Sequence, residues 1–128
     1  LKKQKYVSIQ EGSDGSVTVT ITKQGMVRAL TYQLETLNIQ KPKTWDERWR
    51  VVIFDVPEKY KELRDTFRMR LRQMGLTQLQ ESVYVSPYPC FHEIEFLREL
   101  YGIAVTVRYL TVEKIEDDEF LRTYFKLS

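Results

Sequence analysis

The stretch WRVVIFDVPE, residues 49–58, decides the fold. It is a run of β-branched and aromatic apolar residues that is closed by Asp55 and Pro57. A short apolar run bounded by turn-forming residues is typical of a central, buried β-strand. Pro57 fits the first turn of a helix, because the N–H that it lacks would have no intrahelical partner there. The stretch therefore predicts a buried strand followed by a helix, with the carboxylate of Asp55 at the end of the strand.

Downstream of this strand, helical and strand-like patterns alternate. Gly75 and Gly102 are predicted to end two of the helices, since glycine commonly follows the last helical residue. From Arg50 onward the order is strand-helix-strand-strand-helix-strand plus a helix, which predicts a ferredoxin-like fold of the α+β class. The expected elements after the first strand are a helix over 57–74, strands over 76–80 and 82–86, a helix over 90–101, a strand over 104–112 and a final helix whose acidic start is 116–119.

Each of these helices is expected to bury one apolar face. Acidic residues at the start of the final helix are favourable there, because they face the positive end of the helix dipole. The residues expected to be buried are Leu63, Phe67, Leu71 and Met74 in the first helix, Ile94, Leu97 and Tyr101 in the second, and Phe120, Leu121, Tyr124 and Phe125 in the last.

The segment before this domain predicts a β-hairpin and one helix. Residues 6–10 and 17–21 alternate apolar and polar side chains around a glycine-containing loop. Thr22 is expected to cap a helix that runs through Leu37. Two strands and a helix bury too little surface to be stable alone, so this piece either leans on a neighbour or is the remnant of a larger domain. Residues 38–44 read as a polar linker, since Pro42 cannot continue a helix.

Composition indicates a folded protein of the reducing cytoplasm. The apolar fraction is 42% and the charged fraction 30%, which is typical of a globular chain. Cys90 is the single cysteine, so no intrachain disulfide can form. No apolar run approaches the roughly 20 residues that a membrane-spanning helix needs, and no signal-peptide pattern opens the sequence. We therefore expect a cytoplasmic protein without a membrane partner.

Charge is distributed unevenly along the chain. Residues 1–44 carry seven Lys/Arg and three Asp/Glu, a balance of +4, whereas residues 45–128 carry thirteen and fifteen, a balance of −2. A basic segment joined to a near-neutral one is compatible with a nucleic-acid partner.

Two motifs and their separation resemble a known family. Residues 45–58, WDERWRVVIFDVPE, are followed by Gly75 and by LQESVYVSPYP over 79–89. Together they resemble the central domain of PaaX-type transcriptional regulators, which is itself similar to CRISPR-associated protein two. The resemblance covers residues 45–128. Its carriers are Phe54-Asp55 at the end of one strand and residues 80–84, QESVY, in another.

The first part of the chain is similar to the wing and closing helix of a winged helix-turn-helix. The resemblance therefore implies two parts, a winged-helix remnant over 1–42 and a dimerisation domain over 43–128. It also implies that the recognition helix lies upstream of Leu1, so that the chain is a piece of a longer regulator.

The resemblance implies a PaaX-like DNA-binding transcriptional regulator that forms a homodimer. The alternative is a Mg²⁺-dependent endonuclease or a non-catalytic CRISPR-adaptation subunit, which acts on nucleic acid through Asp55 and has an adaptation integrase as its partner. Val85 stands where the adaptation proteins commonly carry an acid, and this departure favours the regulator branch. A third interpretation is a scaffold that recruits another protein through Tyr88, Phe91 and the last helix.

Asp55 has two open interpretations. The resemblance implies a catalytic residue and Mg²⁺ ligand, with the aspartates of two subunits meeting at the metal; hard oxygen ligands suit this ion. The other interpretation is that Asp55 accepts N–H bonds near Glu58 and caps the turn. No cofactor other than this Mg²⁺ is expected. His92 is expected on the surface in the first turn of its helix, and without a Cys/His cluster we expect no zinc.

Seven basic residues are candidates for contacts to nucleic acid. Three arginines four residues apart share one stripe of the helix over 57–74 and could contact phosphates. Alternatively they pair with Glu58, Glu62 and Asp65 on a solvated face. Lysines of the first segment could follow a DNA backbone. The candidates are Lys2, Lys3, Lys5, Lys23, Arg64, Arg68 and Arg72.

Overall fold

The computed structural model describes residues 7–14, 17–21, 23–102 and 106–127. The chain divides into two compact units, Leu1–Leu37 and Asn38–Ser128. The predicted helix cap Thr22 lies outside the described residues. No helix among the described residues is long and apolar enough to cross a membrane.

The first unit consists of a hairpin and a helix, as predicted. Strands β1 (Val7–Glu11) and β2 (Val17–Ile21) pair antiparallel, with Val7 opposite Ile21. Helix α1 (Lys23–Glu35) follows them. Val27, Leu30 and Tyr32 of α1 are exposed. The assignment of residues 1–42 to a winged helix stays a prediction.

The second unit is a four-stranded antiparallel sheet with helices, in the order β4-β5-β3-β6. With the strands numbered one to four along this unit, the spatial order is 2-3-1-4, which is that of the βαββαβ ferredoxin-like fold. The predicted α+β class and topology are therefore confirmed. The elements are β3 (Trp49–Asp55), η1 (Glu58–Tyr60), α2 (Lys61–Gln73), β4 (Thr77–Gln80), β5 (Val83–Ser86), α3 (Phe91–Tyr101), β6 (Thr106–Val112) and α4 (Glu119–Tyr124).

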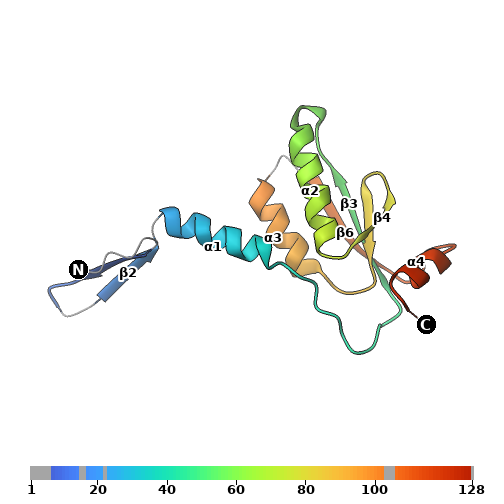
Figure 1. Ribbon diagram of the computed structural model, residues 1–128, viewed down its shortest axis with the longest axis horizontal. Helices are drawn as coiled ribbons and strands as arrows, with labels where there is room; N and C mark the ends of the chain where they lie inside the picture. Colours follow the sequence, from blue (N-terminus) through green and yellow to red (C-terminus); the bar gives the residue numbers. More distant parts are fainter. Residues whose placement is uncertain (1–6, 15–16, 22, 103–105, 128) are drawn as a thin grey trace. The chain divides into compact units, whose positions relative to one another are not determined.

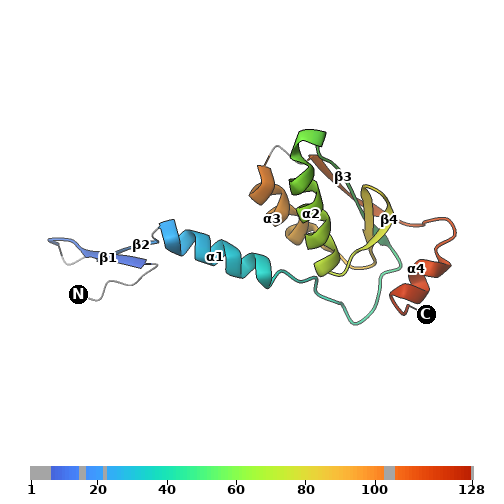
Figure 2. The same cartoon turned by 45° about the horizontal axis from the view of Figure 1, so that its top comes forward.

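One face of the sheet is covered by α2 and α3, which lie side by side in both views (Figure 1, Figure 2). Val52 and Phe54 of β3 are buried on this face, because alternate residues of a strand point to the same side. The Phe54 ring lies 5.0 Å from that of Phe67 on α2 and 5.8 Å from that of Tyr84 on β5. This is the main core, and it uses the predicted faces of both helices.

The other face of the sheet is only half covered. Trp49, Val51 and Val85 form a second buried cluster with Leu121 of α4. Farther along β3 the same face is open, since Ile53 is 38% exposed and Asp55 is also exposed. The cover over Trp49 and Val51 comes from the chain end that includes α4, which Figure 1 draws in red.

The predicted apolar face of the final helix was wrong in part. Leu121 is fully buried and Phe125 is partly buried, but Phe120 is 56% and Tyr124 61% exposed. The helix is only six residues long, so a single turn points at the sheet and cannot bury four large side chains. The linker also differs from its prediction, because Ile39 is buried and lines a hollow together with Met74 and Ser86.

Candidate functional site

The uncovered part of the sheet brings Asp55 together with residues of β6. In the strand register Asp55 is opposite Thr106, Ile53 is opposite Arg108, and Val51 is opposite Leu110. Directly opposed residues of antiparallel strands point to the same face. We call the exposed members of this set, Ile53, Asp55, Thr106, Arg108 and Leu110, the open sheet face. Asp55 lies on this face at the end of β3.

Asp55 makes no side-chain hydrogen bond or ion pair with any residue that the structure describes. The helix turn η1, which begins three residues later, has no side-chain cap hydrogen bond. The structure therefore does not show the capping bond that one interpretation expected. Asp55 ends its strand as an exposed carboxylate.

The described part of one chain does not by itself fit a Mg²⁺ site at Asp55. No group of three or more His, Cys, Asp or Glu residues that could hold a metal ion occurs among the described residues. Mg²⁺ can bind through one or two carboxylates plus waters and substrate phosphates, so a site here would need oxygens from a second chain or from a nucleic acid. The catalytic and metal-binding roles of Asp55 stay predictions.

The three candidate arginines of α2 all make contacts within the chain. Arg64 forms an ion pair with Glu58 at 3.5 Å, and Arg68 lies 3.9 Å from both Asp65 and Glu81. Surface pairs of this kind contribute little and exchange readily. Arg64 and Arg68 therefore have the acidic partners that the alternative expected, but their side chains are only 22% and 18% exposed and do not form a solvated face. Their contact with phosphate stays a prediction.

Arg72 has a different surrounding from the other two. Its Nη1 donates a hydrogen bond of 3.0 Å to the hydroxyl of Tyr84, a residue that is fully buried. A buried hydroxyl without a partner would be costly, so Arg72 stabilises the sheet whatever else it binds. Among the candidate lysines, Lys23 is the first residue of α1, and Lys2, Lys3 and Lys5 lie outside the described residues.

The WDERWR motif, residues 45–50, fixes the start of β3 through hydrogen bonds of its side chains. The sequence did not reveal this role. Arg50 is buried, and its two terminal nitrogens donate to Asp46 at 2.9 and 2.5 Å. Nη1 of Arg50 also donates to the carbonyl of Pro87 at 2.8 Å, which ties β3 to the segment after β5. The hydrogen bond from Arg50 holds the pKa of Asp46 below its ordinary value, against the opposing effect of partial burial.

Trp49 of the same motif fastens α4. Its Nε1 donates to Oδ2 of Asp118 at 3.1 Å, and Nε of Arg122 donates to the same oxygen at 3.1 Å. Burial raises the pKa of Asp118, but these two hydrogen bonds outweigh it, and the pKa is lowered. The guanidinium of Arg122 also lies 5.0 Å from the ring of Trp45. Two residues of the motif, Trp45 and Trp49, thus contact the chain end that covers the second cluster.

Cys90 has no properties of a nucleophile. It is buried, and this burial raises the pKa of its thiol to about 12. Its backbone N–H donates to the hydroxyl of Tyr109 at 3.0 Å. The interpretation of Cys90 as a small packed residue agrees with this position.

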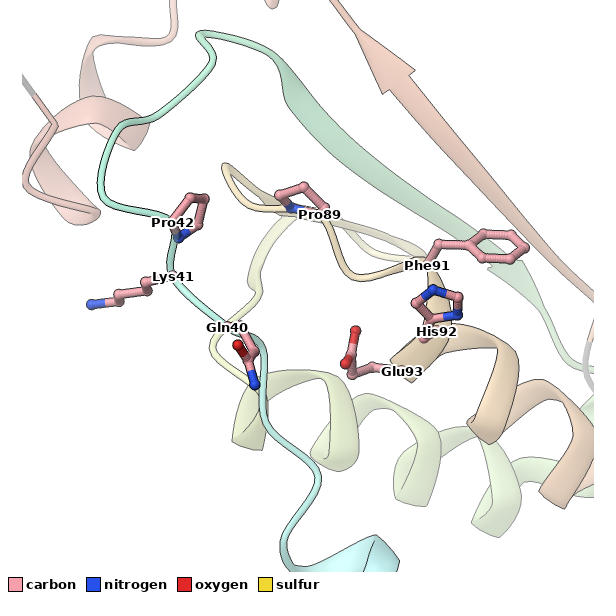
Figure 3. A pocket seen from close by; sticks show the side chains of 7 residues that line it. All are labelled: Gln40, Lys41, Pro42, Pro89, Phe91, His92 and Glu93. Atoms are coloured by element: carbon pink, nitrogen blue, oxygen red, sulfur yellow. The ribbon is translucent and has the colours of Figure 1, made fainter.

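A surface hollow of about 470 Å³ lies beside the start of α3. Figure 3 shows Phe91 and His92 on the first turn of the helix, with Gln40, Lys41 and Pro42 of the linker opposite. His92 is exposed in the first turn of α3, as predicted. The hollow combines an exposed aromatic ring with isolated polar groups and has no buried polar side chain aimed into it.

The strand order, the two helices on one face and the half-covered second face define an α+β protein of the ferredoxin-like class. Residues 42–121 match the family described as the PaaX protein central Cas2-like domain, and the chain belongs to this family. The resemblance inferred from the motifs around Asp55 and Ser82 is confirmed by this match. None of the curated proteins compared with the chain is similar to it.

Proposed function

We propose that this chain is part of a PaaX-like DNA-binding transcriptional regulator. Residues 43–128 pair two copies, and residues 1–42 belong to a winged helix-turn-helix that binds DNA. A two-fold dimer presents two such DNA-binding parts to the two halves of a symmetric operator. The observation that carries the proposal is the open sheet face, on a domain of the PaaX family.

The open sheet face supports self-association because it leaves two large apolar side chains of the sheet exposed. Ile53 is 38% and Leu110 36% exposed, and each stands next to a residue of the covered cluster. Large apolar side chains that lie together and are rimmed by charges mark interaction surfaces. On this proposal, the chain end that includes α4 covers Trp49 and Val51 on this side of the sheet, and a second copy covers the open sheet face.

The charge distribution supports DNA as the partner of the first part. The balance of +4 over residues 1–44 contrasts with −2 over the rest. Positive residues that neutralise phosphates give binding that weakens steeply as salt rises. The proposal therefore places the affinity for DNA in residues 1–44.

Sedimentation velocity of this chain over a range of concentrations tests the dimer. We expect a reversible dimer at micromolar concentration. A species that stays monomeric at the highest concentration reached would contradict the proposed role of residues 43–128.

A cleavage assay tests the competing nuclease function. Linear and supercoiled DNA are incubated with Mg²⁺ and either the wild-type chain or Asp55→Ala, with a chelator control. On the regulator proposal the DNA is unchanged in every lane. Cleavage that disappears both in Asp55→Ala and in chelator would instead establish the metal-dependent nuclease.

A further inference from the structure

The open sheet face carries one acid and one base that have no side-chain partner in the part of the chain that the structure describes. Neither Asp55 nor Arg108 makes a side-chain hydrogen bond or ion pair with any described residue, and both are exposed. This separates them from the charged residues of α2 and of the 45–50 motif, where arginines find carboxylates nearby. Asp55 and Arg108 are therefore both available to bind a charged group of another molecule.

The strand register fixes how these two charges are arranged. Arg108 stands opposite Ile53, and Asp55 stands two residues farther along β3. The two residues are therefore diagonal neighbours on adjacent strands, about 7–8 Å apart. Leu110 continues the row on β6 beyond Arg108. The open sheet face thus presents one acid, Asp55, one base, Arg108, and two apolar side chains, Ile53 and Leu110.

Such a surface is complementary to itself. In a two-fold interface the same patch is used by both copies, so that if residue i contacts residue j, then j also contacts i. We propose that Asp55 of one copy pairs with Arg108 of a second copy, twice across a two-fold axis, while Ile53 and Leu110 form the apolar centre. Asp55 is then a residue that determines the partner and its register. This inference rests on the proposed dimer and specifies how the dimer is recognised.

A second copy explains this face better than a nucleic acid does. DNA would be repelled by Asp55, which is exposed, like Arg108, and is its diagonal neighbour on the adjacent strand. Complementary charges at an interface suppress wrong pairings, because like charges brought together are costly. The inference therefore predicts that reversing either charge alone breaks the dimer.

The test uses two charge reversals in the intact chain, Asp55→Arg and Arg108→Asp. Each variant alone places like charges together twice in the interface, so its dissociation constant should rise at least tenfold. When the two variants are mixed, each copy regains an opposite charge at both contacts, and a heterodimer should form. Native mass spectrometry separates this heterodimer from homodimers by mass, and the double variant in one chain should dimerise again.

A matched control reverses an exposed acid on a different element. Glu99→Arg on α3 changes the net charge by the same amount as Asp55→Arg and should leave the dissociation constant unchanged. Circular dichroism shows whether each variant is folded. Wild-type behaviour of Asp55→Arg, or single variants that dissociate but do not recombine when mixed, would overturn the inference.

The failure of this inference can be distinguished from failure of the proposed function. If the wild-type chain never dimerises, the proposed regulator dimer is itself contradicted. If the wild-type chain dimerises and both charge-reversal variants dimerise equally well, the proposed dimer stands and only the pairing of Asp55 with Arg108 is contradicted. A dimer that dissociates on addition of chelator would replace the ion pair by a shared metal ion and would also overturn the inference.

Discussion

Arg50 shows how a single buried cation organises the start of β3. Its guanidinium donates to both carboxylate oxygens of Asp46 and to the carbonyls of Arg48 and Pro87, so that four acceptors depend on one side chain. Asp46 itself is half exposed, and water can replace part of what it would lose. The carbonyl of Pro87, whose bond to Arg50 is buried, has less access to water.

We predict that Arg50→Met lowers the free energy of unfolding by about 2 kcal/mol, because hydrogen bonds to charged groups are stronger than neutral ones. Methionine keeps most of the volume, so the effect isolates the guanidinium. Urea denaturation provides the measurement. Arg48→Met, at an exposed neighbour in the same motif, is the control and should change stability by less than about 0.5 kcal/mol. Equal effects of the two changes would contradict the role given to Arg50.

The same pair predicts a dependence of stability on pH. The hydrogen bond from Arg50 lowers the pKa of Asp46 in the folded state, so the unfolded chain binds this proton more readily. The contribution is complete above the unfolded-state pKa and is lost as the pH falls through the folded-state pKa. The difference in unfolding free energy between wild type and Asp46→Asn should therefore be constant from neutral pH downward and shrink below about pH 4. A difference that grows in acid would refute this assignment.

At the scale of elements, α4 depends on its contacts with the sheet. A helix of six residues is not stable alone. It is held by the fully buried Leu121 and by the bond between Trp49 and Asp118. Its exposed Phe120 and Tyr124 contribute much less to this contact.

We predict that Leu121→Ala destabilises the domain by about 3 kcal/mol, as large-to-small changes in a core do. It should also free α4 from the sheet, since Leu121 is its only buried residue. Tryptophan fluorescence should shift to longer wavelength as water reaches Trp49, and the chain end should become sensitive to protease under native conditions. Phe120→Ala is the control and should change neither readout. Unchanged protection in Leu121→Ala would show that α4 is held by other contacts.

The sequence revealed the order of these elements but not the cover formed by α4. Periodicity is a local signal, and it placed β3, α2 and α3 because each buries a regular face against the sheet. The hydrogen bond between Trp49 and Asp118 joins residues 69 positions apart, and no local sequence pattern predicts such a pair. The motif of residues 45–50 resembles a family signature in the sequence, but its bonds to Pro87 and Asp118 join residues far apart along the chain and leave no local pattern.

Asp55 illustrates the same limit at the candidate site. Its place at the end of a strand followed from the apolar run before it, and β3 does end at Asp55. Its neighbour Arg108 lies on a strand more than fifty residues later, and only the register of β3 with β6 brings the two onto one face. Pairing of strands is set by the whole sheet, so this juxtaposition could not be inferred from spacing.

At the scale of the whole molecule, the proposed regulator separates DNA binding from self-association. Residues 1–44 carry the positive balance, while the open sheet face belongs to the second unit. The two activities should therefore respond to different substitutions. On this proposal, charge reversal at Asp55 should weaken association between chains, whereas neutral substitutions of lysine in the first segment should weaken the phosphate contacts.

The first-segment lysines provide the measurement that separates these roles. Each phosphate contact contributes about 0.9 to the slope of log affinity against log salt for duplex DNA. Changing the four candidate lysines to glutamine should weaken binding and lower this slope in fluorescence anisotropy titrations, while dimerisation stays intact. Changing four lysines of the second unit removes the same charge and should leave the slope unchanged; equal slopes in the two variants would show that general charge, and not the first segment, attracts DNA. The two sets are Lys2, Lys3, Lys5 and Lys23, and Lys59, Lys61, Lys114 and Lys126.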